Sequence, residues 1–221
     1  MNKPSAIPRE KCQQIVSSAG TSLAEKAVSG RFEWGTDLGI EADVEQYVER
    51  NLMRVSALLD DTAVLVGDGR LLGAAASARA GLETMAVLAD FFRKFKSAVK
   101  RVDGDEIKRV LSSYIFASLE FSGLSQQKTP NVMDAVRNSE KMQNGMMAVY
   151  GVLCEAVHPN WSGRIQESND VEVNWYSATA QRLVVAISIS ASFSTVLIGD
   201  LEEFFRFTRT NRRNLQNAIL F

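Results

Sequence analysis

The chain's four prolines leave its long apolar-periodic stretches uninterrupted. They are Pro4, Pro8, Pro130 and Pro159. Proline removes a backbone hydrogen-bond donor and clashes with the preceding helical turn, so long stretches without it favour long helices. Strict alternation of apolar and polar residues, which is typical of half-buried strands, is scarce. The sequence therefore predicts an all-α protein.

Six helices follow from the pattern, with a seventh as the alternative count. They are expected at about residues 8–28, 41–66, 71–100, 105–120, 131–157 and 175–208. Pro8 suits the first turn of the first helix, and Asp103 or Asp105 can cap the fourth. The polar loop at 159–174 could hold a short strand pair. We expect one domain over residues 1–221: a helix and loop (1–40), a bundle core with long central helices (41–208) and a basic C-terminal tail or helix end (209–221).

Charge, cysteine content and motifs narrow the classes of function. The formal net charge is −1, so the chain as a whole has no attraction to nucleic acid or to an anionic membrane. Cys12 and Cys154 are far apart, and with a single histidine they form neither a disulfide framework nor a zinc pattern. Nucleotide-binding glycine loops and paired-carboxylate metal motifs are absent from the sequence. We therefore expect no metal and no cofactor.

The stretch 183–199 tests the expected location of the protein. These residues include no charged side chain, and the length of the stretch is at the lower edge of a membrane span. The stretch also holds four serines and a threonine. We interpret it as the central helix of a soluble bundle, and a membrane segment is the alternative. The N-terminus lacks the apolar run of a secretion signal, so the cytoplasm is the simplest location.

The expected third helix has two contrasting sides. Small residues recur at every fourth position on one side: Gly73, Ser77 and Gly81. Such a seam lets a neighbouring helix approach closely. Nearly opposite lie Arg79, Glu83 and Asp90, among small apolar residues. Arg79 and Glu83 form either an exposed pair of little energetic value or a half-buried pair that needs further partners.

His158, the one histidine of the chain, stands at the end of the expected fifth helix. Tyr150, Cys154 and His158 are spaced four residues apart, and Pro159 pushes His158 out of the helical conformation. The helix dipole and Glu155 would favour the imidazolium form. His158 is thus either a capping residue or a general acid or base placed at a helix end.

Two short motifs carry a resemblance to a known family. Residues 67–83 read G-D-G-R-L-L-G-A-A-A-S-A-R-A-G-L-E, and a later motif consists of Tyr150, Leu153, Cys154, His158 and Pro159. Together they resemble the R-x-x-x-E and Y-x-x-L-S-x-x-x-H-P signatures of a bacterial all-helical family of unknown function. That family looks distantly related to HEPN domains, many of which are ribonucleases of toxin and phage-defence systems. The resemblance covers roughly residues 45–165.

The resemblance implies that Arg79, Glu83, Tyr150 and His158 meet inside the bundle. One part of the nuclease pattern is missing, because nuclease HEPN domains carry an arginine four to six residues before the histidine. The corresponding positions here are Gly151, Val152 and Leu153.

Two local runs, 93–101 and 206–213, are rich in basic residues. Their candidate RNA-contacting residues are Arg93, Lys94, Lys96, Lys100, Arg101, Arg206, Arg209, Arg212 and Arg213. They could contact phosphates, or they could be solvated helix faces. The stretch 33–61 is rich in acidic residues, so complementary surfaces could also match in a homodimer.

Two functions follow from these features. The first is a non-catalytic binding or regulatory module, in phage defence or stress response, with a polar Arg/Glu/His cluster. The alternative is a HEPN-like, metal-independent ribonuclease. In that enzyme His158 would be the acid and base, Arg79 would stabilise the phosphorane and Glu83 would hold Arg79, beside Tyr150.

Overall fold

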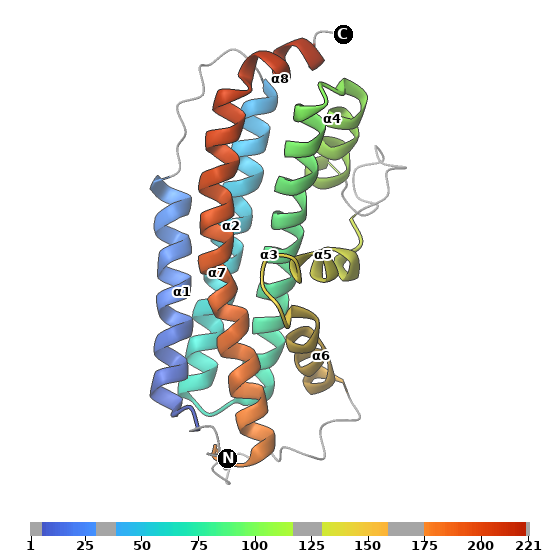
Figure 1. Ribbon diagram of the computed structural model, residues 1–221. Helices are drawn as coiled ribbons and strands as arrows, with labels where there is room; N and C mark the ends of the chain where they lie inside the picture. Colours follow the sequence, from blue (N-terminus) through green and yellow to red (C-terminus); the bar gives the residue numbers. More distant parts are fainter. Residues whose placement is uncertain (1–5, 30–38, 117–129, 159–174, 220–221) are drawn as a thin grey trace.

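The computed structural model describes residues 6–29, 39–116, 130–158 and 175–219 (Figure 1). These residues form eight α-helices and one π-helical turn, with no strand among them, so the predicted all-α class is confirmed. The elements are α1 (Arg9–Ser29), α2 (Gly39–Gly67), α3 (Leu71–Lys100), α4 (Gly104–Leu111), η1 (Ser112–Phe116), α5 (Val132–Ser139), α6 (Met146–Val157), α7 (Ala178–Thr210) and α8 (Arg212–Ile219).

Four long helices, α1, α2, α3 and α7, form an elongated bundle. They run side by side, and α5 and α6 lie along the outer side of α3 (Figure 1). The bundle is closed because α7 packs against both α1 and α3, while α2 packs against α1 and α3 from the other side. The predicted bundle with long central helices is therefore present.

The core at one end of the bundle is aromatic. Phe91, Phe92 and Phe95 of α3 and Phe204 of α7 are fully buried, and the rings of Phe92 and Phe204 stack with centroids 4.5 Å apart. Burying each such ring stabilises the fold by about 1.5–3 kcal/mol relative to leaving it exposed. These contacts fix α3 against α7 and thus hold the outer side of α3 toward α5 and α6.

The predicted seam of small residues on α3 lies against α2. A Cβ added at Gly73 would stand 3.4 Å from the Leu65 side chain. The Ser77 hydroxyl donates a hydrogen bond to the carbonyl oxygen of Leu58 at 2.8 Å. Since this side of α3 is occupied by α2, the opposite side with Arg79, Glu83 and Asp90 is left for the outer helices.

The prediction of a single fifth helix at 131–157 is wrong, because two helices, α5 and α6, occupy that range. Gly145 adopts a left-handed backbone with φ of +88°, which no helix interior accommodates. The Glu140 carboxylate then accepts hydrogen bonds from the backbone N–H groups of Gly145 and Met147, at 2.9 and 2.5 Å, and caps α6. The apolar periodicity continues across the turn, so the sequence pattern alone concealed it.

Two further boundaries differ from expectation. Asp103 caps α4 by accepting from the Glu106 N–H at 2.9 Å, as one of the two predicted caps. The helix continues through η1 to Phe116, and the rest of the range expected to reach 120 lies outside the described residues. Of the two alternatives for 209–221, a tail or a helix end, the structure has helix: α7 ends at Thr210, and residues 212–219 form the separate helix α8. The expected count of six or seven helices is therefore too low. The predicted strand pair at 159–174 also lies outside the described residues.

Candidate functional site

The polar side of α3 faces the outer helices and carries two clusters of charged residues. The Arg79 cluster comprises Arg79, Glu83 and Tyr150. The Asp90 cluster comprises Asp90, Arg93, Lys94, Tyr114 and Asn138. Because α5 and α6 both pack on α3, each cluster joins α3 to another part of the chain.

In the Arg79 cluster one carboxylate oxygen receives two donors. Arg79 Nε donates to Glu83 Oε1 at 2.8 Å, and the Tyr150 hydroxyl of α6 donates to the same oxygen at 2.9 Å. The Arg79 guanidinium carbon lies 5.5 Å from the Tyr150 ring centroid, within the range of a cation–π contact. The Arg79 and Glu83 side chains are 34% and 27% exposed. The structure thus supports the half-buried pair with a further partner.

The surroundings of the Arg79 cluster raise the pKa values of Tyr150 and Arg79. Burial, followed by the hydrogen bond to Glu83, raises the pKa of Tyr150 to about 12. For Arg79, burial lowers the pKa, but hydrogen bonds to Glu83 and Tyr150 outweigh it and the pKa is raised. At neutral pH Tyr150 is therefore a neutral donor and Arg79 a fixed cation.

His158 does not join this cluster through any contact among the described residues. It ends α6 in an extended conformation (φ −77°, ψ 134°), and its backbone N–H donates to the Glu155 carbonyl at 3.2 Å. It is exposed, and it lies eight residues beyond Tyr150, about 12 Å along the helix axis. The structure brings together Arg79, Glu83 and Tyr150, and the meeting of all four implied by the resemblance is seen only for these three.

The Asp90 cluster surrounds a buried carboxylate with four donors. The Asp90 side chain is 3% exposed. Its Oδ1 accepts from Arg93 at 2.6 Å and from the Asn138 amide of α5 at 3.1 Å. Its Oδ2 accepts from the Tyr114 hydroxyl of η1 at 2.5 Å and pairs with Lys94 at 2.9 Å. Such a carboxylate is fully satisfied, as a buried charge must be.

The same contacts hold Asp90 ionised. Burial alone would raise the pKa of Asp90, but hydrogen bonds from Tyr114, Arg93 and Lys94 outweigh it and lower the pKa below its ordinary value of 3.8. Burial and then the bond to Asp90 raise the pKa of Tyr114. The spacing of Asp90, Arg93 and Lys94 on one helix could have indicated part of this cluster from the sequence. Tyr114 and Asn138 come from distant elements and carried no sequence signal.

A cleft of about 340 Å³ opens beside Asp90, between α3, α5 and α7. Its charged lining residues are Asp90, Arg93, Lys96, Lys100, Lys141, Asp200 and Glu203. Lys96 Nζ pairs with Asp200 at 2.9 Å and with Glu203 at 3.2 Å. Lys100 and Lys141 make no ion pair with any described residue, although Lys100 lies 5.5 Å from the Phe207 ring.

The structure places the predicted RNA-contacting residues in two groups. In the first run, Arg93, Lys94 and Lys96 are paired with carboxylates, whereas Lys100 is exposed and makes no ion pair with any described residue. Arg101, Arg206, Arg209 and Arg213 are exposed, and Arg212 is half-buried. The end of the bundle formed by α7 and α8 therefore keeps an exposed basic surface. Contact with RNA there stays a prediction.

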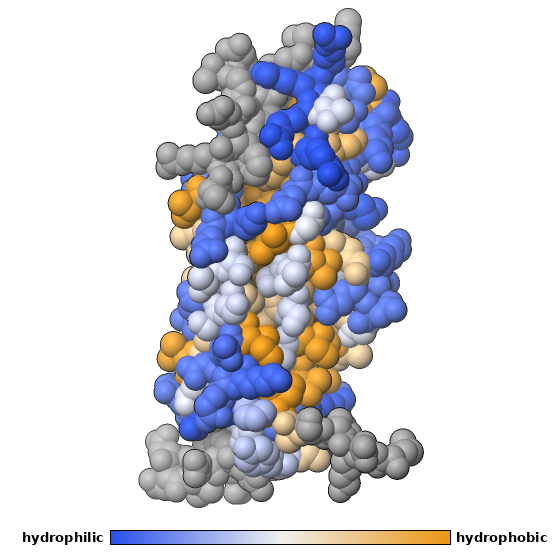
Figure 2. Space-filling view, turned by 60° about the vertical axis from the view of Figure 1, so that its left-hand side comes forward, coloured by the Kyte–Doolittle hydropathy of each residue, from blue (hydrophilic) through white to orange (hydrophobic). Residues whose placement is uncertain are grey.

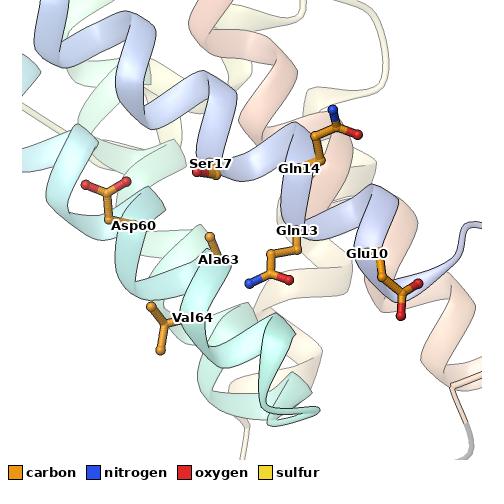
Figure 3. Close-up of a pocket in the computed structure, with 7 residues that line it drawn as sticks. All are labelled: Glu10, Gln13, Gln14, Ser17, Asp60, Ala63 and Val64. Atoms are coloured by element: carbon orange, nitrogen blue, oxygen red, sulfur yellow. The ribbon is translucent and has the colours of Figure 1, made fainter.

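A second hollow lies between α1 and α2, with a volume of about 420 Å³ (Figure 3). Its lining residues are Glu10, Gln13, Gln14, Ser17, Asp60, Ala63 and Val64. Gln13 reaches from α1 toward α2 in Figure 3, and a Cβ added at Gly67 would come within 2.6 Å of its amide. The lining has no cation and no acid–base pair, so it is a weaker candidate than the cleft beside Asp90.

Two features of the described residues bear on metal binding and on membrane association. No group of three or more His, Cys, Asp or Glu side chains among them could hold a metal ion. By length and composition, α3 and α7 are apolar enough to cross a membrane, and 50% and 56% of their apolar windows are buried inside the bundle. Core helices have the same character, so the cytoplasmic location stays a prediction.

No protein-family model, curated protein or solved structure matches this chain. The resemblance to the HEPN-like family therefore rests on its two short motifs alone.

Proposed function

We propose that this chain is a non-catalytic helical binding module that takes a small anionic ligand in the cleft between α3, α5 and α7. The observation that carries the proposal is the pair of lysines, Lys100 and Lys141, that line the cleft without an ion-pair partner among the described residues. The volume of about 340 Å³ is within the range of small-molecule sites.

The charge of the cleft favours an anion. Four cations, Arg93, Lys96, Lys100 and Lys141, face three carboxylates, Asp90, Asp200 and Glu203, which is a net charge of +1. The carboxylates are engaged by Arg93, Lys94 and Lys96. A ligand carrying a phosphate or carboxylate group would find its partners in the two remaining lysines. The ion pairs hold the walls in place before the ligand arrives.

The Arg79 cluster supports a structural rather than a catalytic role. A general acid or base must reach the same reacting atoms as its partner groups. Here Glu83 is occupied by Arg79 and Tyr150, and His158 is exposed at the end of α6 without a described contact to them. The ribonuclease alternative requires His158 and Arg79 to act on one phosphate and stays a prediction. A role in phage defence or stress response also stays a prediction, because it comes from the resemblance.

Titration calorimetry with AMP, inorganic phosphate and citrate tests the proposal. We expect Lys141→Gln to weaken binding about tenfold, as for the loss of about 1.4 kcal/mol of charged contact. The matched control is Arg101→Gln, because Arg101 is exposed just beyond the end of α3 and does not line the cleft. Binding that Arg101→Gln weakens as much as Lys141→Gln does, or no binding of any probe, would contradict the site.

A second assay separates the two functions. The full chain is incubated with single-stranded RNA in the presence of a chelator, beside His158→Ala. We expect no cleavage by either protein. Cleavage by the wild type that His158→Ala abolishes would replace the binding module with the ribonuclease.

A further inference from the structure

The outward side of α7 carries a regular stripe whose two charged ends contact α6 and α3, while its middle stays exposed or half-buried. Its members follow alternating spacings of three and four residues, and all are exposed or half-buried: Arg182, Val185, Ile189, Ser192, Val196, Gly199 and Glu203. This is the a/d spacing with which one helix packs along another. Only the two ends of the stripe are charged. Figure 2 brings the side with α1 and α7 forward and shows a band of apolar and near-neutral residues between hydrophilic regions.

The composition of the stripe is unusual for a helix face that meets only water. Val185 is 40% exposed, and Ile189 and Val196 are half-buried. Gly199 stands inside the helix, and a Cβ added there would meet nothing within 4 Å. A glycine in a helix interior is destabilising relative to alanine. Packing among the described residues does not require that glycine, whereas close approach of a second helix would.

The stripe is complementary to itself when a second copy runs antiparallel. With a two-fold axis at Ser192, Val185 comes opposite Gly199 and Ile189 opposite Val196. At the ends, Arg182 comes opposite Glu203, and their side chains are 60% and 57% exposed. Among the described residues Arg182 makes a 3.8 Å contact to Glu155, and Glu203 pairs with Lys96 at 3.2 Å while more than half of its side chain stays in solvent. A large residue therefore meets a small one, and a cation meets an anion, at both ends of the stripe.

We propose that two copies of this chain associate through this stripe, with their α7 helices antiparallel. The same patch serves both copies, as a two-fold interface requires. The stripe spans 21 residue steps, about 32 Å of helix. With a width of about 10 Å it is smaller than the roughly 800 Å² per partner of a standard interface. The dimer is consequently expected to dissociate on dilution.

Sedimentation of the full chain over micromolar to sub-millimolar concentrations tests the interface. The wild type should show a monomer–dimer equilibrium. Ser192→Lys places two like charges at the two-fold axis and should raise the dissociation constant at least about tenfold. The matched control is Ser17→Lys, an exposed serine of α1 that lines the α1–α2 hollow, and it should leave the dissociation constant unchanged. Thermal unfolding monitored by circular dichroism should show that both variants are folded.

Charge reversal tests the register of the helices. Arg182→Glu and Glu203→Arg should each weaken the dimer, and the double variant should restore it, because the opposed pair is then reversed at both ends. A chain that stays monomeric at every concentration overturns the proposal. So does an equal effect of Ser17→Lys and Ser192→Lys, or a double variant weaker than either single one. A monomer that binds phosphatidylcholine vesicles, with Ser192→Lys abolishing that binding, would assign the stripe to lipid instead.

Discussion

The two polar clusters on α3 have similar components and very different surroundings. Each has a carboxylate on α3, a cation on the same helix and a tyrosine hydroxyl from another element. In the Arg79 cluster the Glu83 side chain is 27% exposed, whereas in the Asp90 cluster the Asp90 side chain is 3% exposed. Glu83 has two donors on one oxygen, and Asp90 has donors on both oxygens.

The difference shows how burial decides the energetic weight of the same chemistry. Water can replace a lost partner of Glu83, because that side chain still meets solvent. Nothing replaces a lost partner of Asp90, so each donor there offsets part of a large desolvation cost. The Asp90 cluster should therefore dominate stability, and the Arg79 cluster should contribute little.

The largest expected effect is that of Asp90→Ala. Its removal leaves Tyr114 and Asn138 without their acceptor, and we expect a loss of about 3 kcal/mol in the free energy of unfolding. The matched change Glu83→Ala should cost about 1 kcal/mol, since the remaining Arg79 and Tyr150 can be hydrated. Urea unfolding of both variants measures the two losses. Equal losses would show that burial of the carboxylate does not set the energetic weight of the two clusters.

Lowering the pH should also reveal how much the buried Asp90 carboxylate contributes to the free energy of unfolding. The folded-state pKa of Asp90 is lowered, so the unfolded chain takes up the proton first as the pH falls. The stabilisation from Asp90 is complete above the unfolded-state pKa of about 3.9 and is lost as the pH falls from there through the folded-state pKa. The difference in unfolding free energy between the wild type and Asp90→Asn should shrink below about pH 4. A difference that stays constant down to pH 2 would refute this assignment.

A smaller effect should come from removing one hydroxyl in each cluster. Tyr114→Phe deletes a donor to a buried carboxylate and should cost about 1.5–2 kcal/mol. Tyr150→Phe deletes a donor to the half-exposed Glu83 and should cost about 0.5–1 kcal/mol. Both changes keep the ring, so the difference between them isolates burial. Thermal and urea unfolding provide the measurement, and a reversed order would overturn the comparison.

The smallest expected effect is that of His158→Ala. His158 is exposed, and its observed hydrogen bond uses the backbone N–H, which alanine retains. We expect a change within about 0.5 kcal/mol in the free energy of unfolding. A loss as large as that of Tyr150→Phe would place the imidazole in the Arg79 cluster after all.

Much of the fold could be predicted from the sequence because it depends on local pattern. The apolar period and the absence of proline placed α1, α2, α3 and α7 to within a few residues. The turn between α5 and α6 was missed, since the apolar period continues across it and only the left-handed Gly145 and the Glu140 cap interrupt the helix. Helix ends depend on backbone conformation, which periodicity does not record.

The candidate site, like the fold, could be predicted from the sequence only in part. The 100° step of the helix is enough to place Arg79, Glu83 and Asp90 on one side of α3. The basic run 93–101 singled out Lys96 and Lys100, but as candidates for RNA contact and not as residues of a cleft. The sequence could not indicate that Lys96 is taken up by Asp200 and Glu203, more than a hundred residues away. Such pairings depend on which helices the core brings together.

The sequence by itself determined the helical class, the long helices and the two contrasting sides of α3, because these follow from spacing along one chain segment. Only the tertiary structure decided what each side meets. It buried Asp90 beside Tyr114 and Asn138, left the Glu83 side chain partly exposed to solvent and placed His158 at an exposed helix end. The physical reason is that desolvation and hydrogen-bond satisfaction depend on neighbours from distant segments, and packing alone selects those neighbours.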